Sequence, residues 1–169
     1  MRATVRTRVA IDANFSRRVQ AAAVQAAKLT FDQAWEHILD QMGSEVWRWA
    51  EGRTTYRGST YKSQSKSRTQ GTPVGSPRNI VDTGLLRASG YMTVNGTMAT
   101  FRFPINYATA VHNGAFIYPW GDKTRTRVYL PPRPFVTAPL GLTPYPGVPV
   151  FPIRQEFRLN FQRAFRTVA

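Results

Sequence analysis

The chain has 169 residues, of which 42% are hydrophobic and 12% aromatic, enough apolar material for the core of a single domain spanning residues 1–169. It contains no cysteine, which excludes disulfides, thiolate metal sites and cysteine nucleophiles. The 23 Lys and Arg against 9 Asp and Glu give a net charge of +14, which favours polyanionic or acidic partners. No run approaches the roughly 18 apolar residues of a membrane span, and the N-terminal residues lack the apolar core of a signal peptide, so we expect neither membrane insertion nor export.

Two kinds of periodicity open the chain. Residues 2–11 alternate polar and apolar side chains, which predicts a short strand with one buried face. From residue 16 to residue 50 the pattern becomes helical, with an apolar stripe at Phe31, Trp35, Ile38, Leu39, Met42, Val46 and Trp49. A second stripe of small residues suits the close approach of another backbone, at Val19, Ala22, Ala23, Ala26 and Ala27.

The end of this helix leads into a long basic segment. Thr30 followed by Gln33 resembles a capping box, so a break in the helix near Leu29–Thr30 stays open, and Gly52 is the expected stop. Residues 52–81 carry six Lys or Arg, no acidic residue and many Ser, Thr and Gly. This composition predicts a long loop that is mobile in the free subunit.

A more compact region follows the loop. Residues 82–89 (DTGLLRAS) predict one short helical turn, with Asp82 or Thr83 as its N-cap. Two strand-like runs then flank Asn95-Gly96, a strong hairpin signal. The second run has one apolar face, made of Phe101, Phe103 and Ile105. The sequence NYATAVHNG predicts a short helix that ends at Gly114 and points three side chains inward, those of Tyr107, Ala108 and Val111.

The last third of the chain combines irregular segments with a final helix. Residues 115–150 are rich in Pro and Gly and contain two strand-like fragments, TRVYL and RPFVTA. Apolar residues at helical spacing then predict an amphipathic helix, with Ile153, Phe157, Phe161, Ala164, Phe165 and Val168 on one stripe. Its other faces carry Arg154, Arg158, Arg163 and Arg166. The order of elements predicts an α+β fold in which a long N-terminal helix and a C-terminal amphipathic helix pack on a mainly antiparallel sheet.

Residue patterns that carry catalysis are scarce. The two histidines, His37 and His112, lack the neighbouring partners that a catalytic or metal site requires. Asp32, Glu36 and Asp40 share one helix face, but such a row is more often solvated or paired with basic residues than bound to a cation. The chain has no G-x-S-x-G elbow, P-loop, dinucleotide fingerprint or HExxH motif. We therefore expect no enzymatic activity, no cofactor and no metal site.

Three short motifs point to a family. Residues 83–89 (TGLLRAS) fit the pattern TGxLRxS, residues 107–114 (YATAVHNG) correspond to YAxxVExG, and residues 132–139 (PRPFVTAP) correspond to xRPFxxPA. In this order, between a long first helix and an amphipathic last one, they resemble phage tail-completion and head–tail joining proteins. That family groups with minor tail protein Z and the phage virion-morphogenesis proteins. His112-Asn113 departs from it, because the family commonly has an acidic residue there.

The resemblance implies a structural subunit of the tailed-phage neck. Such a subunit is made in the host cytoplasm and forms a homo-oligomeric ring at the head–tail junction of the virion, through which DNA passes. Six-fold order is favoured, with twelve-fold as the alternative, and the neighbours are other neck, tail-terminator, tail-tube or head-closure proteins. The motif residues expected to maintain the fold, or to contact a partner, are Asp82, Arg87, Tyr107, His112, Arg133 and Phe135.

The basic loop keeps a second function in view. It places Tyr56 and Tyr61 among basic residues, an arrangement that can stack on bases and contact phosphates, or order against a protein partner. The basic residues concerned are Arg53, Arg57, Lys62, Lys66 and Arg68. The alternative function is therefore sequence-independent DNA binding, and a nuclease that uses the helix carboxylates is the least favoured hypothesis.

Overall fold

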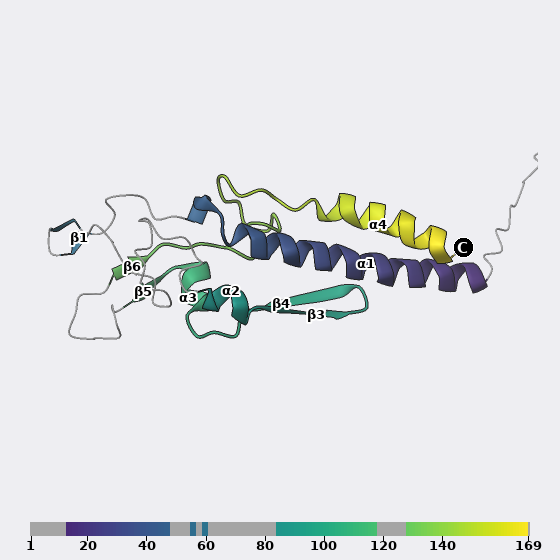
Figure 1. The fold of residues 1–169 in the computed structure, drawn as a ribbon, viewed down its shortest axis with the longest axis horizontal. Helices are drawn as coiled ribbons and strands as arrows, with labels where there is room; N and C mark the ends of the chain where they lie inside the picture. The colour runs from purple at the N-terminus through teal and green to yellow at the C-terminus, as the bar shows by residue number, and fades with distance from the viewer. Residues whose placement is uncertain (1–12, 48–54, 57–58, 61–83, 118–127, 169) are drawn as a thin grey trace, which may run out of the picture.

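The structure is a computed structural model that describes residues 13–47, 55–56, 59–60, 84–117 and 128–168. The strand expected at residues 2–11 lies outside these ranges, as does most of the basic loop, including all five of its basic residues named above. Within the described part, the molecule is elongated and one long helix, α1 (Ala13–Gln41), runs along most of its length (Figure 1).

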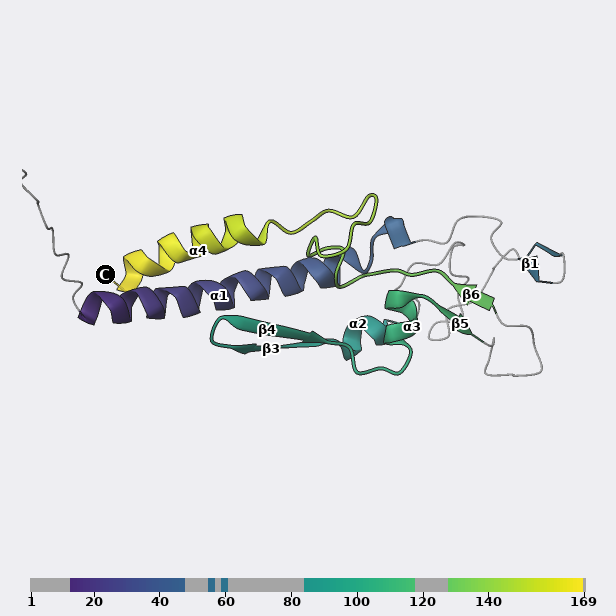
Figure 2. The same ribbon diagram turned by 180° about the vertical axis from the view of Figure 1, so that it is seen from behind.

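Helix α4 (Ile153–Val168) packs along α1 in the opposite direction, so the end of the chain lies beside the beginning of α1 (Figures 1 and 2). The predicted stripe of small residues lies at this contact. Ala22 and Ala26 are fully buried and Ala27 nearly so, which confirms that small side chains let another element approach the α1 backbone. Without such residues, the two helix axes would be held further apart.

The α1 helix continues through Thr30 without the break that the capping-box pattern left open. Thr30 is buried, and its hydroxyl donates a hydrogen bond to the carbonyl oxygen of Ala26 one turn earlier (2.7 Å). The same hydroxyl accepts a bond from the side-chain amide of Asn160 in α4 (3.1 Å), which also donates to Gln33 Oε1 (2.9 Å). Thr30 and Gln33 thus bind the neighbouring helix instead of capping a new one.

The prediction that this helix extends to residue 50 and stops at Gly52 was wrong. The helix ends at Gln41, and a short 3-10 turn, η1 (Glu45–Trp47), follows. Trp47 is fully buried, and its indole N–H donates to the Gln41 carbonyl oxygen (2.6 Å), a group that a helix end leaves without an intrahelical partner. The burial of this indole therefore ends the helix before the predicted apolar stripe reaches its last residues. Trp49, the last residue of that stripe, lies outside the described residues.

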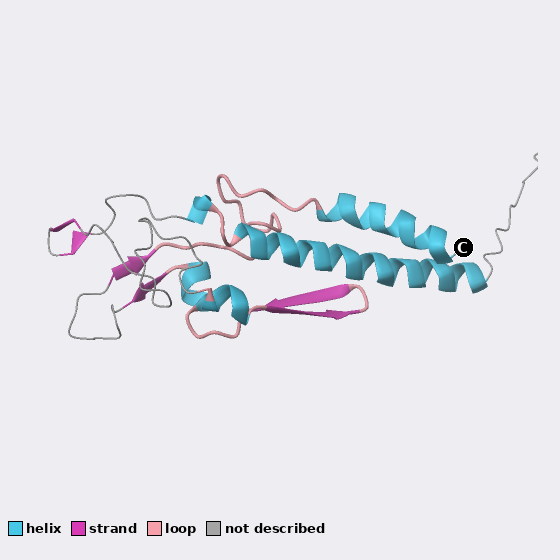
Figure 3. Cartoon of the chain, viewed as in Figure 1, coloured by secondary structure: helices cyan, strands magenta, loops and turns pink. Residues whose placement is uncertain are grey.

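A β-hairpin covers the face of α1 opposite to α4 (Figure 3), and it confirms the predicted strand pair. Strand β3 (Tyr91–Asn95) pairs with β4 (Met98–Arg102), so the two-residue turn is Gly96-Thr97, one position later than expected. Gly96 has a φ of +59°, which the tight hairpin turn requires. The hairpin packs through aromatic rings, since Trp35 stacks on Phe101 with centroids 5.8 Å apart and also contacts Phe103 (5.5 Å).

Short elements fill the other end of the molecule. Helix α2 (Leu85–Ser89) confirms the predicted turn, but its N-cap is Gly84, with φ +71° and no side-chain cap; Asp82 and Thr83 lie outside the described residues. Helix α3 (Ala108–Asn113) ends at Gly114 as expected. Four further strand segments are short: β5 (Ala115–Ile117) pairs with β6 (Val128–Leu130), and β1 (Thr55–Tyr56) pairs with β2 (Ser59–Thr60).

Two inferences about side chains and strands in this region need correction. Tyr107 is exposed instead of pointing inward, because it stands at the N-cap of α3, before the helix face that buries Ala108. The fragment RPFVTA forms successive turns and no strand, with Ala138 N donating to Pro134 O (2.8 Å). Pro134 has no N–H to give to a strand ladder, which is the physical reason.

The segment between these turns and α4 is bound to α1. Phe151 N donates to Pro139 O (2.7 Å), and His37 Nε2 donates to Pro149 O (2.9 Å) while its ring lies against that of Phe151. His37 therefore has a structural partner that lies 112 residues further along the chain. With two long helices and antiparallel strand pairs, the predicted α+β class is confirmed.

We expect Asn160→Ala to destabilise the protein by about 2 kcal/mol, because it removes two hydrogen bonds from a side chain that is only 2% exposed. Chemical unfolding followed by circular dichroism measures the change. Gln162→Ala, which truncates an exposed amide on the same helix, is the control and should stay within about 0.5 kcal/mol of the wild type. Equal effects of the two variants would contradict the role given to Asn160.

Gly90→Ala tests the contact between the hairpin and α1. A Cβ at this position would lie 2.5 Å from a ring atom of Phe103 and 2.7 Å from one of Trp35, so the aromatic packing must shift. We expect a loss of about 1–3 kcal/mol and a changed tryptophan emission spectrum. Gly43→Ala is the matched control, since its nearest contact would be 3.4 Å from the Asp40 carbonyl oxygen. A wild-type spectrum and stability in Gly90→Ala would refute this packing.

Candidate assembly surface

The three sequence motifs meet in one hydrophobic cluster. Leu86 comes from the first motif, Ala108 from the second, and Phe135 and Ala138 from the third. The remaining buried members are Met42, Trp47 and Val148. Although these motifs are separated by tens of residues, they form a single packed unit at the end of α1. Their apolar residues therefore hold the fold together.

Phe135 lies at the centre of this cluster and is 1% exposed. Its ring makes edge-to-face contacts with Phe103 (5.0 Å between centroids) and with His112 (5.4 Å). The ring of His112 is held from both nitrogens: Nδ1 lies 2.7 Å from Asn113 Oδ1, and Nε2 lies 3.4 Å from the Thr137 hydroxyl. The His112 side chain thus positions the second motif against the third.

Arg133 is buried next to Phe135, with 6% of its surface exposed. Its backbone N–H donates to Val111 O (3.0 Å), which ties the third motif to α3. Burial lowers the pKa of Arg133 to about 10, and the nearby Tyr145 partly opposes this shift. The guanidinium therefore stays protonated at neutral pH, where the burial of its charge destabilises the folded state. This destabilisation decreases as the pH rises above about 10, because the buried group then loses its proton more readily than the same group in the unfolded chain.

Three of the predicted contact residues, His112, Arg133 and Phe135, come together in this cluster, whereas the other two in the described ranges do not share its burial. Arg87 and Tyr107 are exposed, whereas Arg133 and Phe135 are buried and His112 is half-buried. Asp82 lies outside the described residues, so the role expected for it stays a prediction. Exposed side chains also lie on the long helices.

A row of phenylalanines follows one edge of α4. The rings of Phe157 and Phe161 stack with centroids 6.3 Å apart, and those of Phe161 and Phe165 with centroids 5.9 Å apart. Phe15 of α1 extends the row by an edge contact with Phe165 (6.0 Å), and Arg18 lies over the Phe165 ring (5.6 Å). The helical spacing predicted this stripe but gave no sign that its members would stay partly exposed; Phe157 is 37% exposed.

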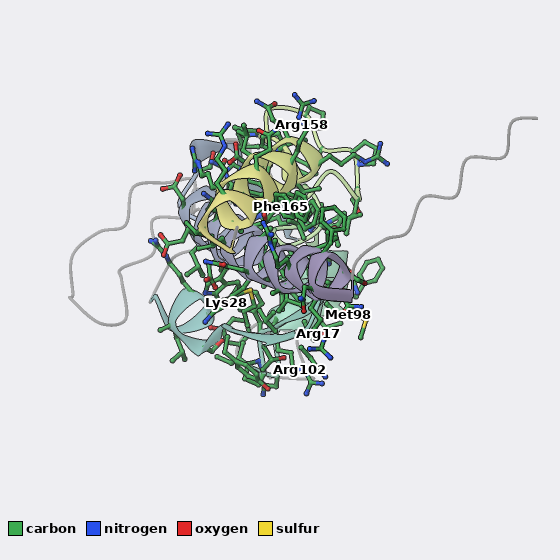
Figure 4. All side chains as sticks on the ribbon, turned by 90° about the vertical axis from the view of Figure 1, so that its right-hand side faces the viewer. Arg17, Lys28, Met98, Arg102, Arg158 and Phe165 are labelled. Atoms are coloured by element: carbon green, nitrogen blue, oxygen red, sulfur yellow. The ribbon has the colours of Figure 1, made fainter. Side chains whose placement is uncertain are left out.

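Charged side chains border this row. All four arginines of α4 are exposed, and Figure 4 shows Arg158 on the side of that helix turned away from α1. The acidic side chains of α1 are also exposed, at Asp32, Glu36 and Asp40. In the described part of the chain, none of these acidic groups forms an ion pair with an α4 arginine. Asp40 accepts a hydrogen bond from the side-chain amide of Gln41 (3.5 Å), and both sets of charges lie at the surface.

Other kinds of site are not found in the described ranges. No three His, Asp or Glu side chains there lie close enough together to hold a metal ion. No helix there is both long and apolar enough to cross a bilayer. Comparison of the chain with protein-family models, curated proteins and solved structures gives no match. What the protein does must therefore be inferred from its own residues.

Phe135→Ala should cost about 3–5 kcal/mol of unfolding free energy, because the cavity opens where all three motifs meet. Met98→Ala is the control, since Met98 is 70% exposed on the hairpin and should change stability by no more than about 0.5 kcal/mol. Thermal and urea unfolding give both values. A stable, well-folded Phe135→Ala protein would mean that Phe135 is kept for a partner and not for this core.

Proposed function

We propose that the protein is a non-enzymatic structural subunit of a tailed-phage neck that forms a ring at the head–tail junction. The observation that supports this most is the convergence of the three family-like motifs on one core between a long first helix and an amphipathic last helix. Motifs that serve a fold are expected to meet in this way, whereas motifs that serve catalysis would line a cleft.

The exposed surfaces are suited to protein assembly. The described faces of α1 and α4 carry exposed charges of both signs, and a partly exposed row of aromatic rings runs along α4. Aromatic and arginine side chains are the residue types most enriched where proteins bind one another. A virion subunit needs such surfaces for neighbouring copies and for the neck or tail proteins above and below the ring.

The test is the mass of the purified protein alone and with added phage tails or neck partners. We expect ring-shaped particles in negative stain, or incorporation at the tail end, with a mass by light scattering that is a multiple of the 19.1 kDa chain. The mass of the particle divided by the mass of one chain gives the number of subunits in the ring. A chain that stays monomeric with and without tails would rule the proposal out.

Sequence-independent DNA binding is the competing function. It is favoured by the net charge of +14 and by the exposed arginines of α4. It predicts a dispersed monomer or dimer that binds any DNA sequence, with an affinity that falls steeply as salt is raised. Such binding, in a protein that ignores phage tails, would replace the neck assignment.

A further inference from the structure

The outward face of α4 combines aromatic rings with arginines. Arg154, Phe157, Arg158 and Phe161 stand at positions i, i+3, i+4 and i+7, which places them on one face of the helix. Arg154, Phe157 and Arg158 are exposed and Phe161 is half-buried. In the described part of the chain nothing shields Phe157 further, and 37% of its surface remains exposed. An apolar row of this kind marks a surface that another molecule covers.

A face of α1 has the complementary composition. Leu29, Asp32, Glu36 and Asp40 stand at i, i+3, i+7 and i+11, and all four side chains are exposed. Leu29 is an isolated apolar residue beside three carboxylates, with 42% of its surface exposed. A partner for this face therefore needs cationic groups together with an apolar contact.

The two faces also agree in spacing. On each helix, residues four positions apart lie about 6 Å from one another, so two rows with this period can pair along their length. The α4 face offers arginines alternating with rings, and the α1 face offers carboxylates beside a leucine. Within one chain, no ion pair joins the two faces among the described residues.

We propose that the α4 face of one subunit docks on the acidic α1 face of a second copy of the same chain. The contact is heterologous, since it joins two different faces, and an open row of copies keeps one free face of each kind, at its two ends, until a ring closes. The inference deepens the proposed ring assembly and rests on it. It identifies the surfaces through which neighbouring subunits meet.

Charge and shape favour a second copy over DNA as the occupant. DNA phosphates would suit the arginines, but they would leave the acidic face of α1 unused and would repel it. A DNA duplex keeps its base faces stacked inside, so the thymine methyl groups of the major groove are a much smaller apolar surface than a side chain of a second copy could place against Phe157. A second copy supplies carboxylates and an apolar side chain together. It also uses both faces of every subunit.

The experiment reverses charge on each face separately. One variant carries Asp32→Lys and Glu36→Lys, and the other carries Arg154→Glu and Arg158→Glu. Each variant alone should assemble at least ~100-fold more weakly than the wild type, because like charges then face each other at every contact. An equimolar mixture should restore rings in which the two variants alternate, as measured by light scattering and negative stain. Unfolded chains could not give this rescue.

A matched control carries Arg163→Glu and Arg166→Glu, which make the same change of charge on other faces of α4 and should leave assembly unchanged. The inference is overturned, and the proposed function kept, if both face variants form wild-type rings or if the control blocks assembly equally. It is also overturned if the Arg154/Arg158 variant assembles normally but loses DNA binding. A wild-type chain that never assembles, even with tails, removes the proposed function and this inference together.

Discussion

The α1 helix must bury two of its faces at once. The positions of α4 and of the hairpin both depend on this double burial. One face consists of alanines, with Ala22 and Ala26 fully buried, and it accepts α4 at close range. The other carries Trp35, whose ring stacks on the hairpin strand β4. A helix with a single apolar stripe would support one neighbour only. Here small residues on one side and large residues on the other create three layers, seen end-on in Figure 4.

A buried polar contact aligns the two long helices. Alanine surfaces are smooth, so an interface made only of alanines would allow α4 to slide along α1. Asn160 removes that freedom, because its amide has partners at only one level of α1, at Thr30 and Gln33. A buried amide away from those partners would be left unsatisfied, at a cost of about 1–3 kcal/mol. Asn160 thus sets the position of α4 along α1, together with the ring contact between Phe15 and Phe165.

The burial of motif residues changes how their resemblance to a phage family is understood. Phe135 and Arg133 are buried inside the chain's own fold, so their first role is to hold the surrounding elements in place. Exposed groups lie on α1 and α4, and two motif residues, Arg87 and Tyr107, are exposed as well. A motif can therefore match a family pattern because of its role in the core, without itself identifying a surface that binds a partner.

Local patterns in the sequence determined both long helices, the hairpin and hence the α+β class, because periodicity and turn residues act over a few neighbouring positions. The charge imbalance follows from the composition alone. The end of α1 at Gln41 depended on Trp47 finding its place in the core, a contact that no local pattern records. Likewise, the sequence of α4 places Phe157 on an apolar stripe and makes Asn160 a polar interruption. The fold buries Asn160 and leaves Phe157 partly exposed, because burial depends on which face meets a neighbour, and that is decided by residues more than a hundred positions away.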